Sequence, residues 1–209
     1  MSKSIATVAT LTAALLAVAI PVGLAIVLSS RQAHEAQMTL LTTYAREVMH
    51  RSETTADQAL AATDALAAAH SPDACSDSNL TIMRRFDLAS SYVQAVGHAV
   101  GDTLECSSLG RDAGALPLGP VDWITPMNIK VRISVKFPFD PATTYLVLEN
   151  ADGFAAIINK DLPLDVTTSE PDVTLGGFAT NNGRLYDARG YFDASWVGPM
   201  SARSRHVKS

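Results

Sequence analysis

The chain has 209 residues, a formal net charge of -5 and 47% hydrophobic residues. Without its apolar N-terminal stretch, about 180 residues remain, which is enough for one domain with its own hydrophobic core. The mildly acidic balance argues against nucleic acid as a partner, and the composition is not that of a disordered protein.

Residues 5–28 form an uncharged apolar run near the N-terminus. Spanning a bilayer takes about 20 apolar residues, whereas the apolar core of a cleaved signal peptide has only about 7–15. The run therefore predicts an uncleaved transmembrane anchor that follows a cytoplasmic stub at residues 1–4. Lys3 and Arg31 lie on either side of it, so charge alone does not decide its orientation.

Residues 31–71 predict one long helix that continues from the anchor. The stretch 31–70 contains neither proline nor glycine, and its apolar residues recur with the spacing of one helical face. Pro72 disfavours helix in the residue before it, so the helix is expected to end near Ser71. Two interpretations stay open. The helix packs only on its own domain, or it also forms a homodimer or heterodimer through the anchor and this helix.

Residues 72–198 predict a separate domain that begins with a turn and a short helix. The helix is expected over 80–89 with Asp77 or Ser78 as its cap. A hairpin follows, in which residues 92–100 and 103–108 surround a Gly-Asp pair. Glycines and prolines between 111 and 120 indicate a loop.

Further strands are predicted along the rest of the domain. Residues 129–137 alternate apolar and polar side chains, as in a strand with its charged face in water. Residues 144–149 and 154–158 form a second hairpin around 151–153, and a third hairpin is expected to turn at 181–183. Helices followed by antiparallel strands predict an α+β fold with a PAS-like sheet and flanking helices. Residues 199–209 are expected to be a flexible basic tail.

Cys75 and Cys106 are the two cysteines of the chain. An even number of cysteines in a chain predicted to leave the cytoplasm favours a disulfide. Such a bond would join the turn after the long helix to the second strand of the first hairpin. It is either a structural crosslink or a bond that responds to redox conditions, and the sequence leaves both interpretations open.

The Cys106-Ser107-Ser108 tripeptide, with Gly110 behind it, a partner cysteine upstream and an N-terminal anchor, resembles a known family. It is similar to the periplasmic CSS-motif domain of bacterial membrane-bound cyclic-di-GMP phosphodiesterases, over roughly residues 1–200. The resemblance implies a single-pass protein of the bacterial inner membrane with a sensory domain in the periplasm. It also implies that Cys75 and Cys106 alternate between a disulfide and a dithiol, with the periplasmic thiol–disulfide machinery as partner and the dithiol accompanying active phosphodiesterase.

The sequence departs from the family in one respect. Family members continue through a second span into a catalytic EAL domain, a barrel of the TIM type that needs about 250 residues. This chain ends at Ser209 and contains no Glu-Ala-Leu tripeptide. We therefore expect this chain not to hydrolyse cyclic-di-GMP and to act as a regulatory domain. The alternatives are a truncated remnant of a phosphodiesterase and a periplasmic module that binds a small ligand.

No residue pattern in the sequence indicates a catalytic site, a cofactor or a metal. None of the five histidines pairs at the spacing of a helical metal site, and no hydrolase nucleophile motif occurs. A metal site made from His98, Cys75 and Cys106 is the minor alternative, because a histidine on a strand is usually packed or solvated.

Overall fold

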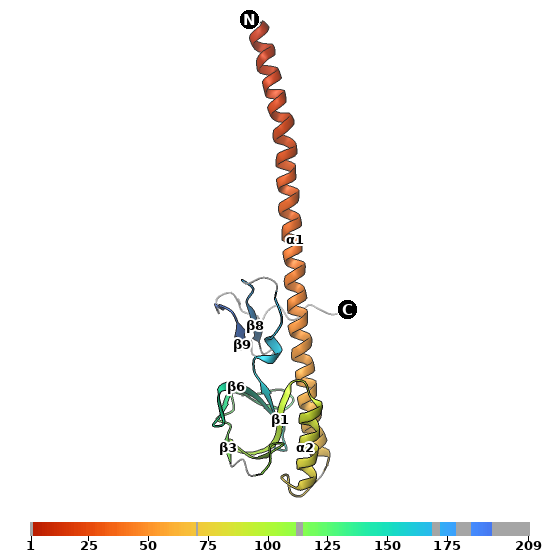
Figure 1. The fold of residues 1–209 in the computed structure, drawn as a ribbon, viewed down its shortest axis with the longest axis vertical. Coiled ribbons are helices and arrows are strands. Elements are labelled where there is room, and N and C mark those ends of the chain that lie inside the picture. The colour runs from red at the N-terminus through yellow and green to blue at the C-terminus, as the bar shows by residue number, and fades with distance from the viewer. Residues whose placement is uncertain (1, 70, 112–114, 169–171, 179–184, 194–209) are drawn as a thin grey trace. The chain divides into compact units, whose positions relative to one another are not determined.

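The computed structural model describes residues 2–69, 71–111, 115–168, 172–178 and 185–193. The chain divides into two compact units, Met1–Arg46 and Glu47–Ser209. Helix α1 (Ser2–Ala68) accounts for the described part of the first unit and also supplies the beginning of the second (Figure 1). The predicted anchor and the predicted long helix are thus one continuous helix.

The first part of α1 carries an exposed apolar surface. Leu15 is 69% exposed, Ile20 64% and Leu24 58%. Among the described residues, α1 is the one helix long and apolar enough to cross a membrane. Pro21 lies inside it, as transmembrane helices tolerate. These features are consistent with the predicted membrane anchor.

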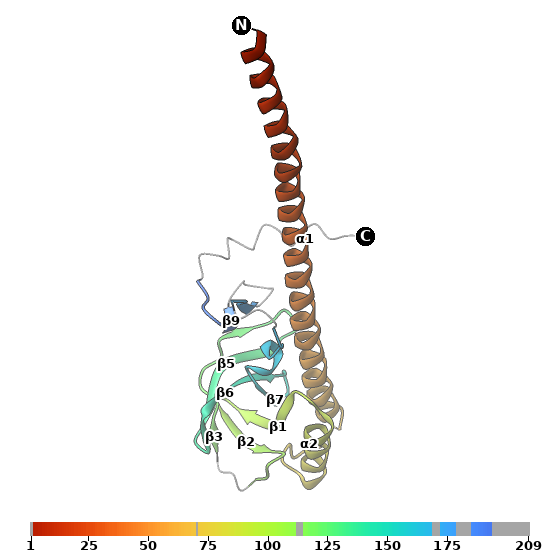
Figure 2. The same cartoon turned by 45° about the horizontal axis from the view of Figure 1, so that its top comes forward.

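The second unit is built on an antiparallel sheet in the order β3-β2-β1-β7-β6-β5-β4. Two hairpin systems, β1-β2 and β5-β6-β7, meet where β1 pairs with β7. Figures 1 and 2 show this sheet curling, with α2 and the last turns of α1 on its outside. This confirms the α+β class and the predicted antiparallel sheet. The strands are β1 (Val93–Val100), β2 (Thr103–Ser107), β3 (Leu116–Pro117), β4 (Trp123–Ile124), β5 (Lys130–Phe137), β6 (Asp140–Glu149) and β7 (Phe154–Asn159).

The first two predicted hairpins are confirmed as β1-β2 and β6-β7. Beyond the 3₁₀ helix η1 (Leu162–Leu164), β8 (Leu175–Phe178) pairs with β9 (Leu185–Arg189), which confirms the third. The turn expected at 181–183 and the tail expected at 199–209 lie outside the described residues.

Two predictions of local secondary structure were wrong. Helix α2 (Asp77–Ala89) begins before residue 80, and its cap is Ser76, whose Oγ accepts a hydrogen bond from the Asn79 amide at 3.3 Å. The expected loop between 111 and 120 contains β3, which pairs with the start of β2 at the edge of the sheet. An edge strand tolerates Pro117 because one side of its backbone needs no partner. Burial of Leu116, at 6% exposed, favours this pairing.

Two apolar cores lie on opposite faces of the sheet, because successive side chains of a strand point to opposite sides. The helix-facing core joins Ala62 and Leu66 of α1 and Met83 of α2 to Val96 of β1. The other face contributes a second core, with Ala95 of the same strand among its members. Its larger members are Leu104, Leu116, Leu118, Val135, Phe137, Val147 and Ile157.

The charged face predicted for residues 129–137 is wrong at Arg132, which is only 1% exposed, although Lys136 lies in water as expected. Arg132 donates from Nη1 to Glu149 Oε2 at 2.6 Å and from Nε to the Gly119 carbonyl at 2.9 Å. Its Nη2 donates to Asp102 Oδ1 at 3.1 Å. Arg132 therefore joins β5 to β6, to the Gly101-Asp102 turn and to the segment after β3, and these partners compensate for burying its charge.

Candidate functional site

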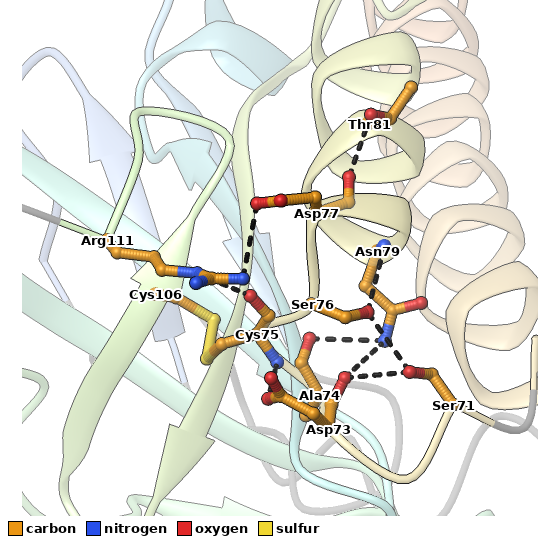
Figure 3. Close-up of polar contacts among 10 residues, drawn as sticks. All are labelled: Ser71, Asp73, Ala74, Cys75, Ser76, Asp77, Asn79, Thr81, Cys106 and Arg111. Atoms are coloured by element: carbon orange, nitrogen blue, oxygen red, sulfur yellow. Dashed lines mark hydrogen bonds and ion pairs between the residues drawn. A yellow bond between two sulfur atoms is a disulfide. The ribbon is translucent and has the colours of Figure 1, made fainter.

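A disulfide between Cys75 and Cys106 closes a loop with a sequence separation of 31. The Cα atoms lie 5.9 Å apart, and the bond ties the segment between α1 and α2 to β2 (Figure 3). Cys106 is 3% exposed and belongs to the helix-facing core, whereas Cys75 is half-buried. The two cysteines therefore differ in burial, although Cys75 also packs against the helix-facing core.

Cys75 lies on a turn held by its neighbours. Asp73 accepts at Oδ1 from the Cys75 amide at 2.9 Å and at its carbonyl from the Ser76 amide at 3.1 Å. The fully buried Asn79 donates from Nδ2 to the Ala74 carbonyl at 3.1 Å. Aspartate and serine favour such turns because their side chains bond to nearby backbone groups. The turn leads directly into α2, as Figure 3 shows.

Arg111 contacts the same turn from beyond the end of β2. Its Nε donates to the Cys75 carbonyl at 2.7 Å, and its Nη2 lies 3.2 Å from Asp77 Oδ1. The side chains of Arg111 and Asp77 are 48% and 97% exposed, and such an exposed ion pair contributes little to stability. Arg111 is an additional polar link between the two chain segments that the disulfide joins.

Ser107 is the last residue of strand β2, and Ser108 follows it. Ser107 accepts at Oγ from the Leu109 amide at 3.2 Å. Ser108 donates its amide to the Val96 carbonyl at 2.7 Å and accepts at Oγ from the Val96 amide at 3.4 Å. Both serines are buried, at 1% and 7% exposed. They satisfy backbone groups beside the disulfide, and in this structure their contacts are structural.

Gly97 also shapes the site, and the sequence analysis missed it. It pairs with Ser107, and a Cβ atom at Gly97 would lie 2.4 Å from the carbonyl oxygen of Cys106. Only glycine allows β1 to approach β2 this closely. A glycine inside an otherwise apolar strand often marks a close approach of another backbone, and this sign was present in the sequence.

A polar cleft of about 510 Å³ opens beside the disulfide. Cys75 lines it together with Asp73, His98, Glu105 and Asp152. His98 pairs with Cys106 across the β1-β2 ladder, so the structure brings together the three residues of the metal alternative. Cys75 is thus the cysteine of the pair that lines the cleft.

A second, mostly apolar pocket lies between the second-unit part of α1 and the sheet. Its volume is about 390 Å³. Among its lining residues are Ala56 and Leu60 of α1, Trp123 of β4 and Ile158 of β7. Small-molecule sites usually measure about 300–1,000 Å³. The pocket therefore has room for a small apolar ligand.

Comparison with known proteins places these features in a family. The family model described as the CSS motif domain associated with EAL matches residues 36–209. No curated protein and no solved structure matches the chain. The matched range includes Cys75, Cys106 and both motif serines. The chain belongs to the family of CSS-motif domains associated with EAL.

Proposed function

We propose that this chain is a redox-responsive regulatory domain of cyclic-di-GMP signalling, anchored in the bacterial inner membrane with its sheet domain in the periplasm. The family match links it to EAL proteins. The observation that carries the redox role is the asymmetric disulfide, in which Cys75 lines a cleft and Cys106 is buried against the helices. Whether a protein disulfide is labile depends on such access.

The proposed reaction is thiol–disulfide exchange with a protein dithiol. One thiolate of that dithiol attacks the sulfur of Cys75, and the sulfur of Cys106 leaves and takes up a proton. The second thiol of the reductant then resolves the mixed disulfide and releases Cys75 as a thiol. Two electrons pass to the chain, and the reductant becomes a disulfide. Attack at Cys75 is favoured because Cys106 is buried.

Opening or closing the disulfide would affect α1 through the helix-facing core and through the turn that follows α1. Cys106 packs in the same cluster as Ala59, Ala62 and Leu66 on the last turns of α1. Opening the bond frees the turn around Cys75 from β2 and leaves hydrogen bonds to hold it. In this proposal the changed restraint alters how α1 pairs with a second copy or with an intact EAL relative.

The first test is the thiol state of both cysteines in intact cells. Cells are quenched with acid and labelled with a mass-shifting maleimide, after oxidising growth and after mild reductant. The proposal expects no label in the first case and two labels in the second, with Cys75→Ser as the one-label standard. A pair that stays oxidised in both conditions would mean that the bond is only a structural crosslink. Free thiols in both would contradict the periplasmic location.

Pairing through α1 is tested by engineered cysteines in the first unit. Met38 and Leu41 are 52% and 47% exposed and lie three positions apart, so they share one helical face. Leu41→Cys is expected to crosslink copies into dimers in the membrane. Thr43→Cys is the matched control, because two residues turn a helix by about 200°. Equal crosslinking of both variants, or none, would argue against a paired face.

The apolar pocket supports a second candidate function, the binding of a small apolar ligand. Ala56→Phe would fill part of the pocket from α1. A ligand present at about 100 times its Kd would stabilise the folded form by about 2.7 kcal/mol. A thermal-shift screen of small alkyl and aromatic compounds should then find a shift that this variant abolishes. The same shift in the variant would exclude the pocket as the binding site.

A further inference from the structure

Opening the disulfide would expose more than two thiols. The sulfur of Cys75 and ligand atoms of His98 and Glu105 all lie within 4.8 Å of one another. The sulfur of Cys106 is bonded to that of Cys75. Two sulfurs, one nitrogen and one carboxylate oxygen thus meet at one place. This is a set of four donors of the types that bind zinc.

A β-bulge creates this juxtaposition. Along the β1-β2 ladder His98 pairs with Cys106, and the next residue, Ala99, pairs with Leu104. Glu105 is therefore the extra residue on β2. Regular alternation would send Glu105 and Cys106 to opposite faces, and a bulge re-aims a side chain. In this structure it allows the carboxylate of Glu105 to approach the same cleft as the disulfide.

His98 is held in place with one nitrogen unpaired. Its ring packs edge-on against Phe154, with centroids 5.2 Å apart, and a Cβ at Gly153 would lie 3.0 Å from Nε2. Its Nδ1 is buried and has no hydrogen-bond partner among the described residues. The carboxylate of Glu105 lies 3.8 Å from Nδ1, which is too far for a hydrogen bond. A buried ring nitrogen without a partner is unusual unless it has a further function.

The oxidation state decides whether the four donors can bind a metal. The thiolate is the metal-binding form of cysteine, so the disulfide leaves His98 and Glu105 as the available ligands among the four. We propose that the reduced chain binds one thiophilic divalent cation, of which Zn²⁺ is the type case, through Cys75, Cys106, His98 and Glu105. This site rests on the proposed redox function because it requires the open bond.

Metal binding requires the two sulfurs to move apart after reduction. Two thiolates on a tetrahedral Zn²⁺, each at about 2.3 Å, lie roughly 3.8 Å apart, whereas in the disulfide the two sulfurs are bonded to each other. Cys75 lies on a half-exposed turn that can supply this movement while Cys106 stays in the core. Asp73 and Asp152 line the same cleft and favour a cation electrostatically.

Reduction of the disulfide and binding of the metal form one coupled reaction, in which electrons and protons balance. A protein dithiol supplies two electrons and two protons to the Cys75–Cys106 bond and becomes a disulfide, which leaves two thiols. Binding of Zn²⁺ replaces the two thiol protons, and these pass to the solvent. Reoxidation of the cysteines would release the metal. The cation would thus hold the turn to β2 in the reduced state, where the covalent bond is lost.

The test uses the full-length chain in detergent micelles, reduced anaerobically with a phosphine, with the thiols counted before metal is added. Zn²⁺ is titrated in competition with a chromophoric chelator, and Co²⁺ is added separately as a spectroscopic probe. We expect one Zn²⁺ per reduced chain, at least tenfold tighter than any binding to the oxidised chain. Co²⁺ should give thiolate charge-transfer bands with the intense visible bands of tetrahedral coordination.

Variants separate this site from other binding. His98→Gln and Glu105→Gln should each weaken Zn²⁺ binding by at least tenfold while the oxidised disulfide still forms, which shows that they fold. The exposed residues His50 and Glu53 provide the controls His50→Gln and Glu53→Gln, which should bind as the wild type does. Two counted thiols with no Zn²⁺ bound, or unchanged binding in both site variants, would overturn the metal site alone. No thiols after reduction would overturn the proposed redox function and this site with it.

Discussion

Replacing Cys75 by serine tests how much the disulfide contributes to stability. The bond closes a loop with a sequence separation of 31. For a loop of this length, the chain-entropy relation gives a stabilisation of about 3.7 kcal/mol, through constraint of the unfolded state. Cys75 is half-buried on a hydrogen-bonded turn, where serine is nearly isosteric. Loss of the crosslink should therefore be most of the effect of Cys75→Ser.

Cys106→Ser should be more destabilising than Cys75→Ser. Cys106 is 3% exposed among apolar side chains of the helix-facing core. A hydroxyl placed there without a hydrogen-bond partner destabilises the protein by about 1–3 kcal/mol, in addition to the effect of the lost crosslink. The expected order of stability is wild type, then Cys75→Ser, then Cys106→Ser.

The assay is urea unfolding of the full-length chain in micelles, followed by tryptophan fluorescence. We expect the free energy of unfolding to fall by about 3–4 kcal/mol in Cys75→Ser. The reduced wild type, with metal removed by a chelator, should match Cys75→Ser within about 1 kcal/mol. A loss below about 1 kcal/mol in Cys75→Ser would refute the loop-entropy argument. Equal losses in the two serine variants would refute the assigned burial difference.

Three further predictions concern other residues of the second unit. Glu149→Leu leaves the buried Arg132 without its shortest contact and should lower the free energy of urea unfolding by about 3–5 kcal/mol, whereas the double variant with Arg132→Met should recover part of this loss. Gly97→Ala places a Cβ 2.4 Å from a backbone carbonyl oxygen of β2 and should reduce the yield of oxidised chain, measured by maleimide labelling after refolding; an unchanged yield would contradict the close approach. Hydrogen bonds from Thr143 and from Tyr145 lower the pKa of Asp140 below its usual 3.8, so their stabilisation is present above that pH and is lost as the pH falls through the lower folded-state value. Asp140→Asn should reduce the acid dependence of the urea midpoint, and an unchanged dependence would refute this assignment.

Both proposals act on one junction. The disulfide and the proposed metal site each connect the turn after α1 to β2. One connection would exist in oxidising conditions and the other in reducing conditions with metal present. Reduced chain without metal would be the state in which this turn is least restrained. Comparing dimer crosslinking at Leu41→Cys in these three states would show which of them α1 responds to.

The sequence by itself predicted the features that depend on local chemistry. The uncharged apolar run, the Gly101-Asp102 turn and the alternation along β5 each have a short-range physical cause, and the predicted anchor, the hairpins and the α+β class followed from such patterns. The family followed from the Cys106-Ser107-Ser108 tripeptide together with its upstream partner. Such signals need few residues because backbone preferences and side-chain periodicity act over short distances.

The tertiary structure decided what depends on contacts between distant segments. Arg132 is the type of residue that an alternating strand exposes to water, yet it donates hydrogen bonds to three separate segments, and these bonds make its burial tolerable. Pro117 belongs to an edge strand only because β2 lies beside it. Glu105 enters the cleft of Cys75 and His98 because one extra residue shifts the register of a ladder. No local pattern encodes that shift, since it depends on how the two strands and the disulfide are packed together.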